Sequence, residues 1–179
     1  YILFMIIGTV LTILIQSSSA TMALTLVMCA NGWIGYDIAA SMVLGENVGT
    51  TITANLAAMV ANTTAKRAAF AHFLFNLFGV MWVLAIFPLF LGWVARLSIY
   101  LGIGDPFNNV GSVPVALSLF HTCFNVANVL ILIWFIKVIA KLVTRIIKSK
   151  ESADDAFTLK HIKIGLLSTP DASLFQAKQ

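Results

Sequence analysis

Long apolar stretches dominate the chain, and two of them are long enough to cross a bilayer. A hydrocarbon core of about 30 Å needs about 20 predominantly apolar residues in helical form. Residues 68–93 and residues 114–136 meet this requirement. Residues 96–111 lie between them and are rich in Gly, Pro and Asn, which indicates a loop. The pattern therefore predicts two membrane-spanning helices joined by a turn-rich segment.

The first 65 residues are apolar as well, but polar residues interrupt them before any piece reaches full spanning length. The interruptions lie at residues 16–19, 31–35 and 45–53. Short apolar pieces separated in this way are typical of discontinuous or re-entrant helices, whose irregular backbone is tolerated at membrane depth only against protein or a water-filled cavity. We therefore predict an all-α polytopic membrane protein with discontinuous helices over residues 1–147, and we expect a binding site at the interruptions.

Composition supports a membrane protein and locates the charge. Hydrophobic residues make up 60% of the chain, charged residues only 10%, and the mean hydropathy is +0.96. Most of the charged side chains follow residue 136, so the net charge of +4 belongs to the C-terminal part. Basic residues beside an apolar run set orientation and meet anionic lipid, so nucleic acid is not an expected partner. Residues 148–179 are predicted to be a cytoplasmic linker that leads to a soluble domain.

Positive charge also predicts the orientation. Lys66 and Arg67 precede the first span, whereas Lys137 and Lys141 follow the second, and the segment between the spans offers only Arg96. Loops rich in Lys and Arg face the cytoplasm. We therefore expect both basic ends, including the C-terminal tail, on the cytoplasmic side of a multi-pass protein of the cell (inner) membrane.

The first polar cluster places an amide and four hydroxyls within six positions of an apolar stretch. Its members are Gln16, Ser17, Ser18, Ser19 and Thr21. An unpaired polar group in hydrocarbon is costly, so these groups must be buried against partners or bind a ligand. Their oxygens suit a sodium ion, and a half-helix N-terminus there would offer N–H donors to an anion. Serines can instead bond back to the preceding turn, but three in succession favour a site.

A second polar cluster repeats this chemistry further along the chain. Its members are Gly45, Glu46, Asn47, Gly49, Thr50 and Thr51. The glycines on both sides of Asn47 predict a broken helix whose second half starts near Thr50. A charge at the bilayer centre is costly, so Glu46 either lies near an interface or has a paired role. The pattern leaves both interpretations open.

Two histidines share the spacing His-x-x-Phe-Asn. His72 and Asn76 form one pair, and His121 and Asn125 form the other. Residues at i and i+4 lie on one face of a helix. An interhelical hydrogen bond explains this spacing better than a functional role does. His72 and Asn76 are therefore predicted only as supporting residues of the site, together with Gly45, Glu46 and Gly49.

Three motifs taken together resemble those of the type II sodium/phosphate cotransporter family, and more closely its bacterial members that carry a cytoplasmic PhoU-like helical domain. They are QSSSAT at residues 16–21, GENVGTT at residues 45–51 and KRAAFAHFLFN at residues 66–76. They occur in the family's order and at about its spacing. The resemblance implies sodium-dependent transport of inorganic phosphate by alternating access, without catalysis, without a cofactor, and with no metal other than the transported sodium.

The resemblance also implies how the chain contributes to a site. Family members have two inverted repeats, each with its own QSSS and GxNxGTT motifs, and substrate and sodium bind between the repeats. This chain has one copy of each motif and resembles the second repeat, so the first repeat of the same protein is an expected partner. Residues 148–179 would then lead into the PhoU-like domain. By the resemblance, the phosphate and sodium ligands are Gln16, Ser17, Ser18, Ser19, Thr21, Asn47, Thr50 and Thr51.

Two further functions compete with transport. A regulatory module that senses phosphate and signals through the C-terminal tail fits the same motifs. An intramembrane serine hydrolase would need a nucleophile among residues 17–19 and His72 or His121 as its base, and the chain has no G-x-S-x-G motif. We therefore predict a transporter and not an enzyme.

Overall fold

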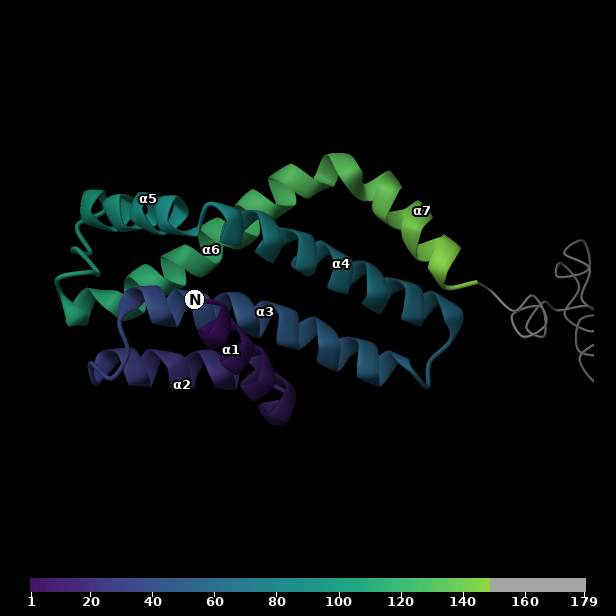
Figure 1. The fold of residues 1–179 in the computed structure, drawn as a ribbon, viewed down its shortest axis with the longest axis horizontal. Helices are drawn as coiled ribbons and strands as arrows, with labels where there is room; N and C mark the ends of the chain where they lie inside the picture. The colour runs from purple at the N-terminus through teal and green to yellow at the C-terminus, as the bar shows by residue number, and fades with distance from the viewer. Residues whose placement is uncertain (149–179) are drawn as a thin grey trace, which may run out of the picture. The chain divides into compact units, whose positions relative to one another are not determined.

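The structure is a computed structural model that describes residues 1–148, and all regular elements in this range are helical (Figure 1). This confirms the predicted all-α fold. The predicted linker and PhoU-like approach over residues 149–179 lie outside the described residues. The helices are α1 (Ile2–Ile15), α2 (Ser18–Ala30), α3 (Tyr36–Ala58), α4 (Thr63–Ala85), α5 (Phe87–Tyr100), α6 (Val113–Leu132) and α7 (Ile136–Ile146), with short 3-10 turns η1 (Val110–Ser112) and η2 (Ile133–Phe135).

Helix α3 is the central element of the helical bundle. Every residue from 39 to 46 is buried, and α3 contacts α1, α2, α4 and α6. At a rise of 1.5 Å per residue, its 23 residues extend over about 35 Å, which is long enough to cross a bilayer. Residues on different faces of α3 therefore meet different neighbours, and this decides which of them can contribute to a site.

One face of α3 packs closely on α1 through glycines. They are Gly8, Gly45 and Gly49. A Cβ atom at Gly45 would overlap the backbone carbonyl of Met5, and one at Gly8 would overlap the carbonyl of Met42. Small residues that let helix backbones approach are a common way for helices to associate in membranes. The glycines of the second motif therefore serve helix packing.

The predicted break near Thr50 is wrong, because α3 is continuous from Tyr36 to Ala58. Thr50 Oγ1 donates to the carbonyl of Glu46 at 2.8 Å, and Asn47 Nδ2 donates to the carbonyl of Val43 at 3.0 Å. Polar side chains that bond back to the preceding turn in this way can bend a helix, but here they do not end it. Gly45 and Gly49 are held against α1, so they do not act as flexible points.

The predicted interruption at residues 16–19 is confirmed. Helix α1 ends where Gln16 takes a left-handed conformation with φ 57°, and Ser17 is extended with φ −148°. Ser17 caps α2, because the Ala20 N–H donates to Ser17 Oγ at 3.3 Å. Helices α1 and α2 have 14 and 13 residues, so each extends over about 20 Å and falls short of a bilayer core. Residues 31–35 separate α2 from α3, as predicted.

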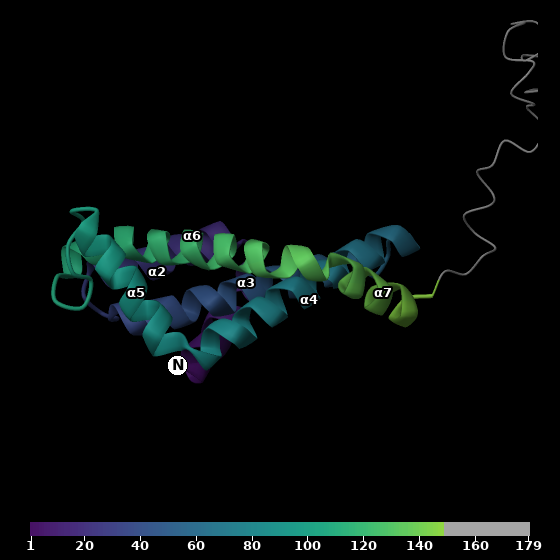
Figure 2. The same cartoon turned by 90° about the horizontal axis from the view of Figure 1, so that it is seen from above.

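The two predicted spans are present, with altered ends. Thr63–Ala85 and Val110–Ile146 are the stretches long and apolar enough to cross a membrane among the described residues. The predicted span over residues 68–93 is broken at Ile86, because Pro88 starts a new helix, α5, which turns away from α4 (Figure 2). Helix α5 continues to Tyr100, so the predicted loop begins at residue 101 and not at residue 96.

The two basic segments lie at the same end of the bundle. The N-terminal end of α4 and the C-terminal end of α7 are adjacent, and the loop between α5 and α6 lies at the opposite end (Figure 1). Arg67 Nε donates to the carbonyl of Ile147 at 3.0 Å. This agrees with the prediction that the basic residues before α4 and those of α7 share one side of the membrane.

Replacing Gly45 tests the close packing of α1 on α3. We expect Gly45→Ala to lower the thermal unfolding midpoint of the detergent-solubilised protein, because the added methyl group meets the Met5 carbonyl. Overpacking of this kind costs about 1–3 kcal/mol. Gly92→Ala is the matched control, since a Cβ atom at Gly92 meets nothing within 4 Å. An unfolding midpoint of Gly45→Ala equal to that of Gly92→Ala would contradict the packing role.

Candidate binding pocket

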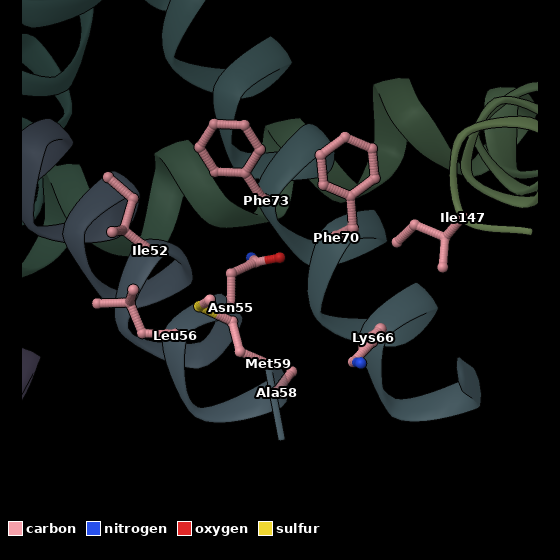
Figure 3. Close-up of a pocket in the computed structure, with 9 residues that line it drawn as sticks. All are labelled: Ile52, Asn55, Leu56, Ala58, Met59, Lys66, Phe70, Phe73 and Ile147. Atoms are coloured by element: carbon pink, nitrogen blue, oxygen red, sulfur yellow. The ribbon is translucent and has the colours of Figure 1, made fainter. Parts of the chain in front are cut away.

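One cavity, of about 560 Å³, is predominantly apolar (Figure 3). Ile52 and Leu56 of α3 lie on one side of it, and Phe70 and Phe73 of α4 on the other. Its one amide, Asn55, already donates to two backbone carbonyls, at 2.7 and 2.9 Å. Of the described residues that line it, Lys66 is charged and the others apart from Asn55 are apolar, so this cavity does not gather the hydroxyl and amide groups of the first two motifs.

A second cavity, of about 410 Å³, is lined by polar side chains from four helices. Helices α2, α3, α4 and α6 each contribute to it, so it gathers residues from all three sequence motifs. A concave site where several polar groups converge is the usual arrangement for a small polar ligand. We call it the polar pocket, and its lining residues are Ser18, Ser19, Met22, Glu46, Asn47, Thr50, His72, Phe75, Asn76, His121 and Asn125.

The N-terminus of α2 lies at the polar pocket. Ser18 and Ser19 are the first residues of that helix and line the pocket. Backbone N–H groups in a first helical turn have no carbonyl one turn earlier in the helix to bond, and the helix dipole makes this end positive. The Ser17 and Ser19 hydroxyls lie 3.2 Å apart, which adds donors at the same place. This end of α2 is suited to binding an anion.

Asn47 connects the wall formed by α3 to α6. Its Oδ1 lies 3.4 Å from His121 Nε2. The expected interhelical hydrogen bond of the histidine motif is thus present, but its partner is Asn47. The amides of the two motifs, Asn76 and Asn125, donate to the carbonyls of His72 and His121 in their own helices, at 3.1 and 2.9 Å. Within residues 1–148 no hydrogen bond is made to the side-chain oxygen of either amide, so both can accept at the pocket.

Glu46 is buried inside the bundle, with 2% of its surface exposed. Its Oε1 accepts a hydrogen bond from Thr25 Oγ1 of α2 at 2.8 Å. No hydrogen-bond partner is present for Oε2 in the part of the chain that the structure describes. The sequence left open whether Glu46 lies near an interface or has a paired role. Its burial and its hydrogen bond to Thr25 support the paired role, with one carboxylate oxygen still unpaired among the described residues.

Several predicted site residues do not line the polar pocket. Thr21 and Thr51 are fully buried, and their hydroxyls donate to the carbonyls of Ser17 and Val48 in their own chain segments, at 3.0 and 2.7 Å. Consecutive residues of a helix point in different directions, so a continuous motif cannot place all its side chains on one face. Gln16 and Ser17 form the helix break, whereas Gly45 and Gly49 face α1.

The first cluster is also less buried than predicted. Gln16 and Ser19 are exposed, and Ser17 and Ser18 are half-buried. The break between α1 and α2 lies at the edge of the bundle, and no described element covers it. The polar groups there are therefore accessible to water or to a further part of the protein.

His121 and Asn125 line the pocket, although neither was predicted as a residue of the binding site. The sequence signal for these two residues was the repeated His-x-x-Phe-Asn spacing. In the structure both copies of this motif lie at the pocket beside α3. The same spacing is equally compatible with a purely structural role, so the fold was needed to show that both pairs meet at the same cavity.

Comparison with known proteins gives a consistent set of relatives. The family model described as Na+/Pi-cotransporter matches residues 2–122. The chain is 34% identical over 146 residues to the uncharacterized protein YqeW of Bacillus subtilis, covering 82% of the chain and 44% of that relative. It is 28% identical over 174 residues to the putative inorganic phosphate export protein YjbB of Escherichia coli, covering 96% of the chain and 30% of YjbB.

A shorter match reaches a human protein. The sodium-dependent phosphate transport protein 2C of Homo sapiens is 40% identical over 78 residues, which is 41% of the chain and 13% of that protein. No solved structure gives a significant match. The chain therefore spans less than half the length of the curated relatives it matches.

Cysteine accessibility tests the position of α2 at a hydrated pocket. We expect Ser19→Cys to react rapidly with a charged, membrane-impermeant thiol reagent, because Ser19 is exposed and lines the polar pocket. Thr21→Cys, two residues further along the same helix, should react far more slowly, since Thr21 is fully buried. Both variants should be made in a background without Cys29 and Cys123, and equal reactivity would contradict the described orientation of α2.

Proposed function

The chain belongs to the Na+/Pi-cotransporter family, and from this premise we propose that the full-length protein carries inorganic phosphate across the membrane together with sodium ions. The observation that supports this most directly is the polar pocket. There the N-terminus of α2, with Ser18 and Ser19, faces the oxygens and amides of α3, α4 and α6. Phosphate offers strong acceptor oxygens to such N–H and O–H donors.

The charge of the lining residues explains why sodium would be required. No Lys or Arg is among the described residues that line the polar pocket, and the ionisable groups there are Glu46, His72 and His121. A phosphate anion in this pocket therefore lacks a fixed positive side chain to balance it. Sodium ions can supply that charge while the neutral oxygens of serine, threonine and asparagine coordinate them. Phosphate and sodium would then stabilise each other's binding.

We propose that the described helices form one of two inverted repeats. The break between α1 and α2 has the form of the discontinuous helices that bind substrate in secondary transporters. The exposed side of Gln16 and Ser19 would face the other repeat, and rocking of the repeats would open the site to alternate sides. By the positive-inside rule, the end that carries Lys66 and Arg67 would be cytoplasmic in the cell membrane, with the C-terminal tail on the same side.

We further propose that the protein is not an enzyme and that the pocket performs no covalent chemistry. Within the described residues His121 Nε2 pairs with Asn47 and the Ser19 hydroxyl pairs with Ser17, and no hydrogen bond joins a serine to His72 or His121, which supports this proposal. Reversible binding and release of phosphate and sodium need no such pair. A phosphate sensor would use the same pocket, but it would bind phosphate without moving it.

Uptake of radiolabelled phosphate by proteoliposomes that contain the full-length protein tests this function. We expect uptake driven by an imposed sodium gradient and none when potassium replaces sodium. Ser18→Ala and Asn47→Ala should raise the phosphate concentration needed for half-maximal uptake, because a hydrogen bond to a charged group contributes about 1.5–3 kcal/mol. This corresponds to roughly a tenfold to hundredfold weaker affinity.

The matched control is Ser118→Ala. Ser118 is an exposed serine of α6 that donates to the carbonyl of Pro114 and does not line the pocket. It should leave uptake unchanged. Phosphate binding without flux would favour the sensor, and uptake indifferent to sodium would contradict the proposed coupling.

A further inference from the structure

Glu46 is a buried acid that lines a pocket suited to an anion. Two negative charges in one pocket need a cation to balance them. We propose that the Glu46 carboxylate is the charged ligand of one transported sodium ion in the polar pocket. The proposal rests on the proposed function and assigns one coupling ion to one side chain. The observations that carry it are the burial of Glu46, its incomplete hydrogen bonding and the absence of a basic partner in the described part of the pocket.

The carboxylate has fewer hydrogen bonds than its burial requires. Its Oε1 meets Thr25 Oγ1 at 2.8 Å, but the same hydroxyl lies 3.1 Å from the carbonyl of Thr21. A threonine hydroxyl has a single proton, so it cannot donate fully to both acceptors. Oε2 has no partner among the described residues. A buried carboxylate in this situation must gain a cation or lose its charge.

The elements packed around Glu46 supply no fixed positive charge. Helix α2 faces it with threonine, and α1 packs on this part of α3 through glycine and threonine. The titratable side chains across the pocket are His72 of α4 and His121 of α6. His121 is bonded to Asn47, and His72 is exposed at the pocket. No ion pair to Glu46 is therefore formed within the described residues.

The remaining oxygens of the pocket suit a sodium ion. Hard cations prefer oxygen ligands, and a single carboxylate combined with neutral oxygens balances one positive charge. Thr50 and Asn47 follow Glu46 on α3, and the Ser18 and Ser19 hydroxyls lie across the same pocket. Several oxygens around one carboxylate favour a sodium site over a simple proton site, since a proton needs only one acceptor.

Binding of sodium at Glu46 also removes an obstacle to phosphate. An ionised Glu46 without a cation would repel an anion at the nearby N-terminus of α2, because Coulomb interactions are strong in a desolvated site. Once sodium neutralises Glu46, the dipole and the hydroxyls of α2 can attract phosphate. Sodium at this site should therefore bind before phosphate, which gives the pocket an order of binding.

The test compares Glu46→Gln with wild type in the full-length protein. Initial uptake of radiolabelled sodium and phosphate, measured in the same proteoliposomes, gives the number of sodium ions moved per phosphate. We expect Glu46→Gln to move one fewer sodium ion per phosphate and to show a shallower sodium activation curve. Glu46→Asp keeps the charge on a shorter side chain, so it should keep the wild-type ratio but need about tenfold or more sodium for half-maximal activation.

Asp37→Asn is the matched control, since it removes one acidic charge from the first turn of the same helix, outside the pocket. It should leave both the ratio and the activation curve unchanged. A wild-type sodium ratio and activation curve in Glu46→Gln would overturn the proposal. It would also be overturned if Glu46→Gln lost proton movement with phosphate at an unchanged sodium ratio.

A binding measurement separates this proposal from the transport function itself. Without phosphate, sodium chloride should raise the thermal unfolding midpoint of the purified wild-type protein above that in choline chloride. Glu46→Gln should show a smaller rise, because one sodium site is lost, and Asp37→Asn should keep the full rise. This pattern supports the sodium site even if the protein proves not to move phosphate, and an equal rise in Glu46→Gln contradicts the site even if phosphate transport is present.

Discussion

Polar groups inside a membrane protein must be hydrogen-bonded or bind a ligand, and this requirement organises the whole chain. Most hydroxyls meet it locally, as Thr12 and Thr21 do by donating to carbonyls one turn earlier. Among residues 1–148, two buried side-chain atoms have no hydrogen-bond partner, the Tyr36 hydroxyl and Oε2 of Glu46. Glu46 lines the polar pocket, and so do Ser18 and Ser19, whose N–H groups in the first turn of α2 have no carbonyl one turn earlier to bond. The pocket thus keeps hydrogen-bonding capacity for a ligand.

The fold positions these groups through two contrasting uses of small and polar residues. At Gln16 and Ser17 the backbone changes direction and a capped helix N-terminus results. At Gly45 and Gly49 the helix continues without interruption, and the glycines let α1 approach. The first arrangement creates a helix N-terminus suited to an anion, and the second holds the helix that presents Glu46 and Asn47 to the same pocket. The proposed coupling then follows from charge balance, because sodium ions and phosphate occupy one cavity.

The sequence predicted the break at residue 16 because a run of polar residues inside an apolar stretch rarely fits an uninterrupted membrane helix. It failed at Gly45 because glycine is equally suited to flexibility and to close packing, and only the position of α1 decides between them. The role of His121 at the pocket was out of reach for a similar reason, since Asn47 is 74 residues away. Composition and motif spacing therefore predicted the elements well, whereas the faces that they share required the tertiary structure.

Equilibrium binding of radiolabelled phosphate to the purified full-length protein tests the central claim most directly. The claim is that phosphate occupies the polar pocket only together with sodium, because the described lining residues provide no Lys or Arg to balance it. At constant ionic strength, phosphate affinity should rise steeply as sodium replaces choline and should be negligible in choline alone. Equal affinity in sodium and in choline would contradict the account.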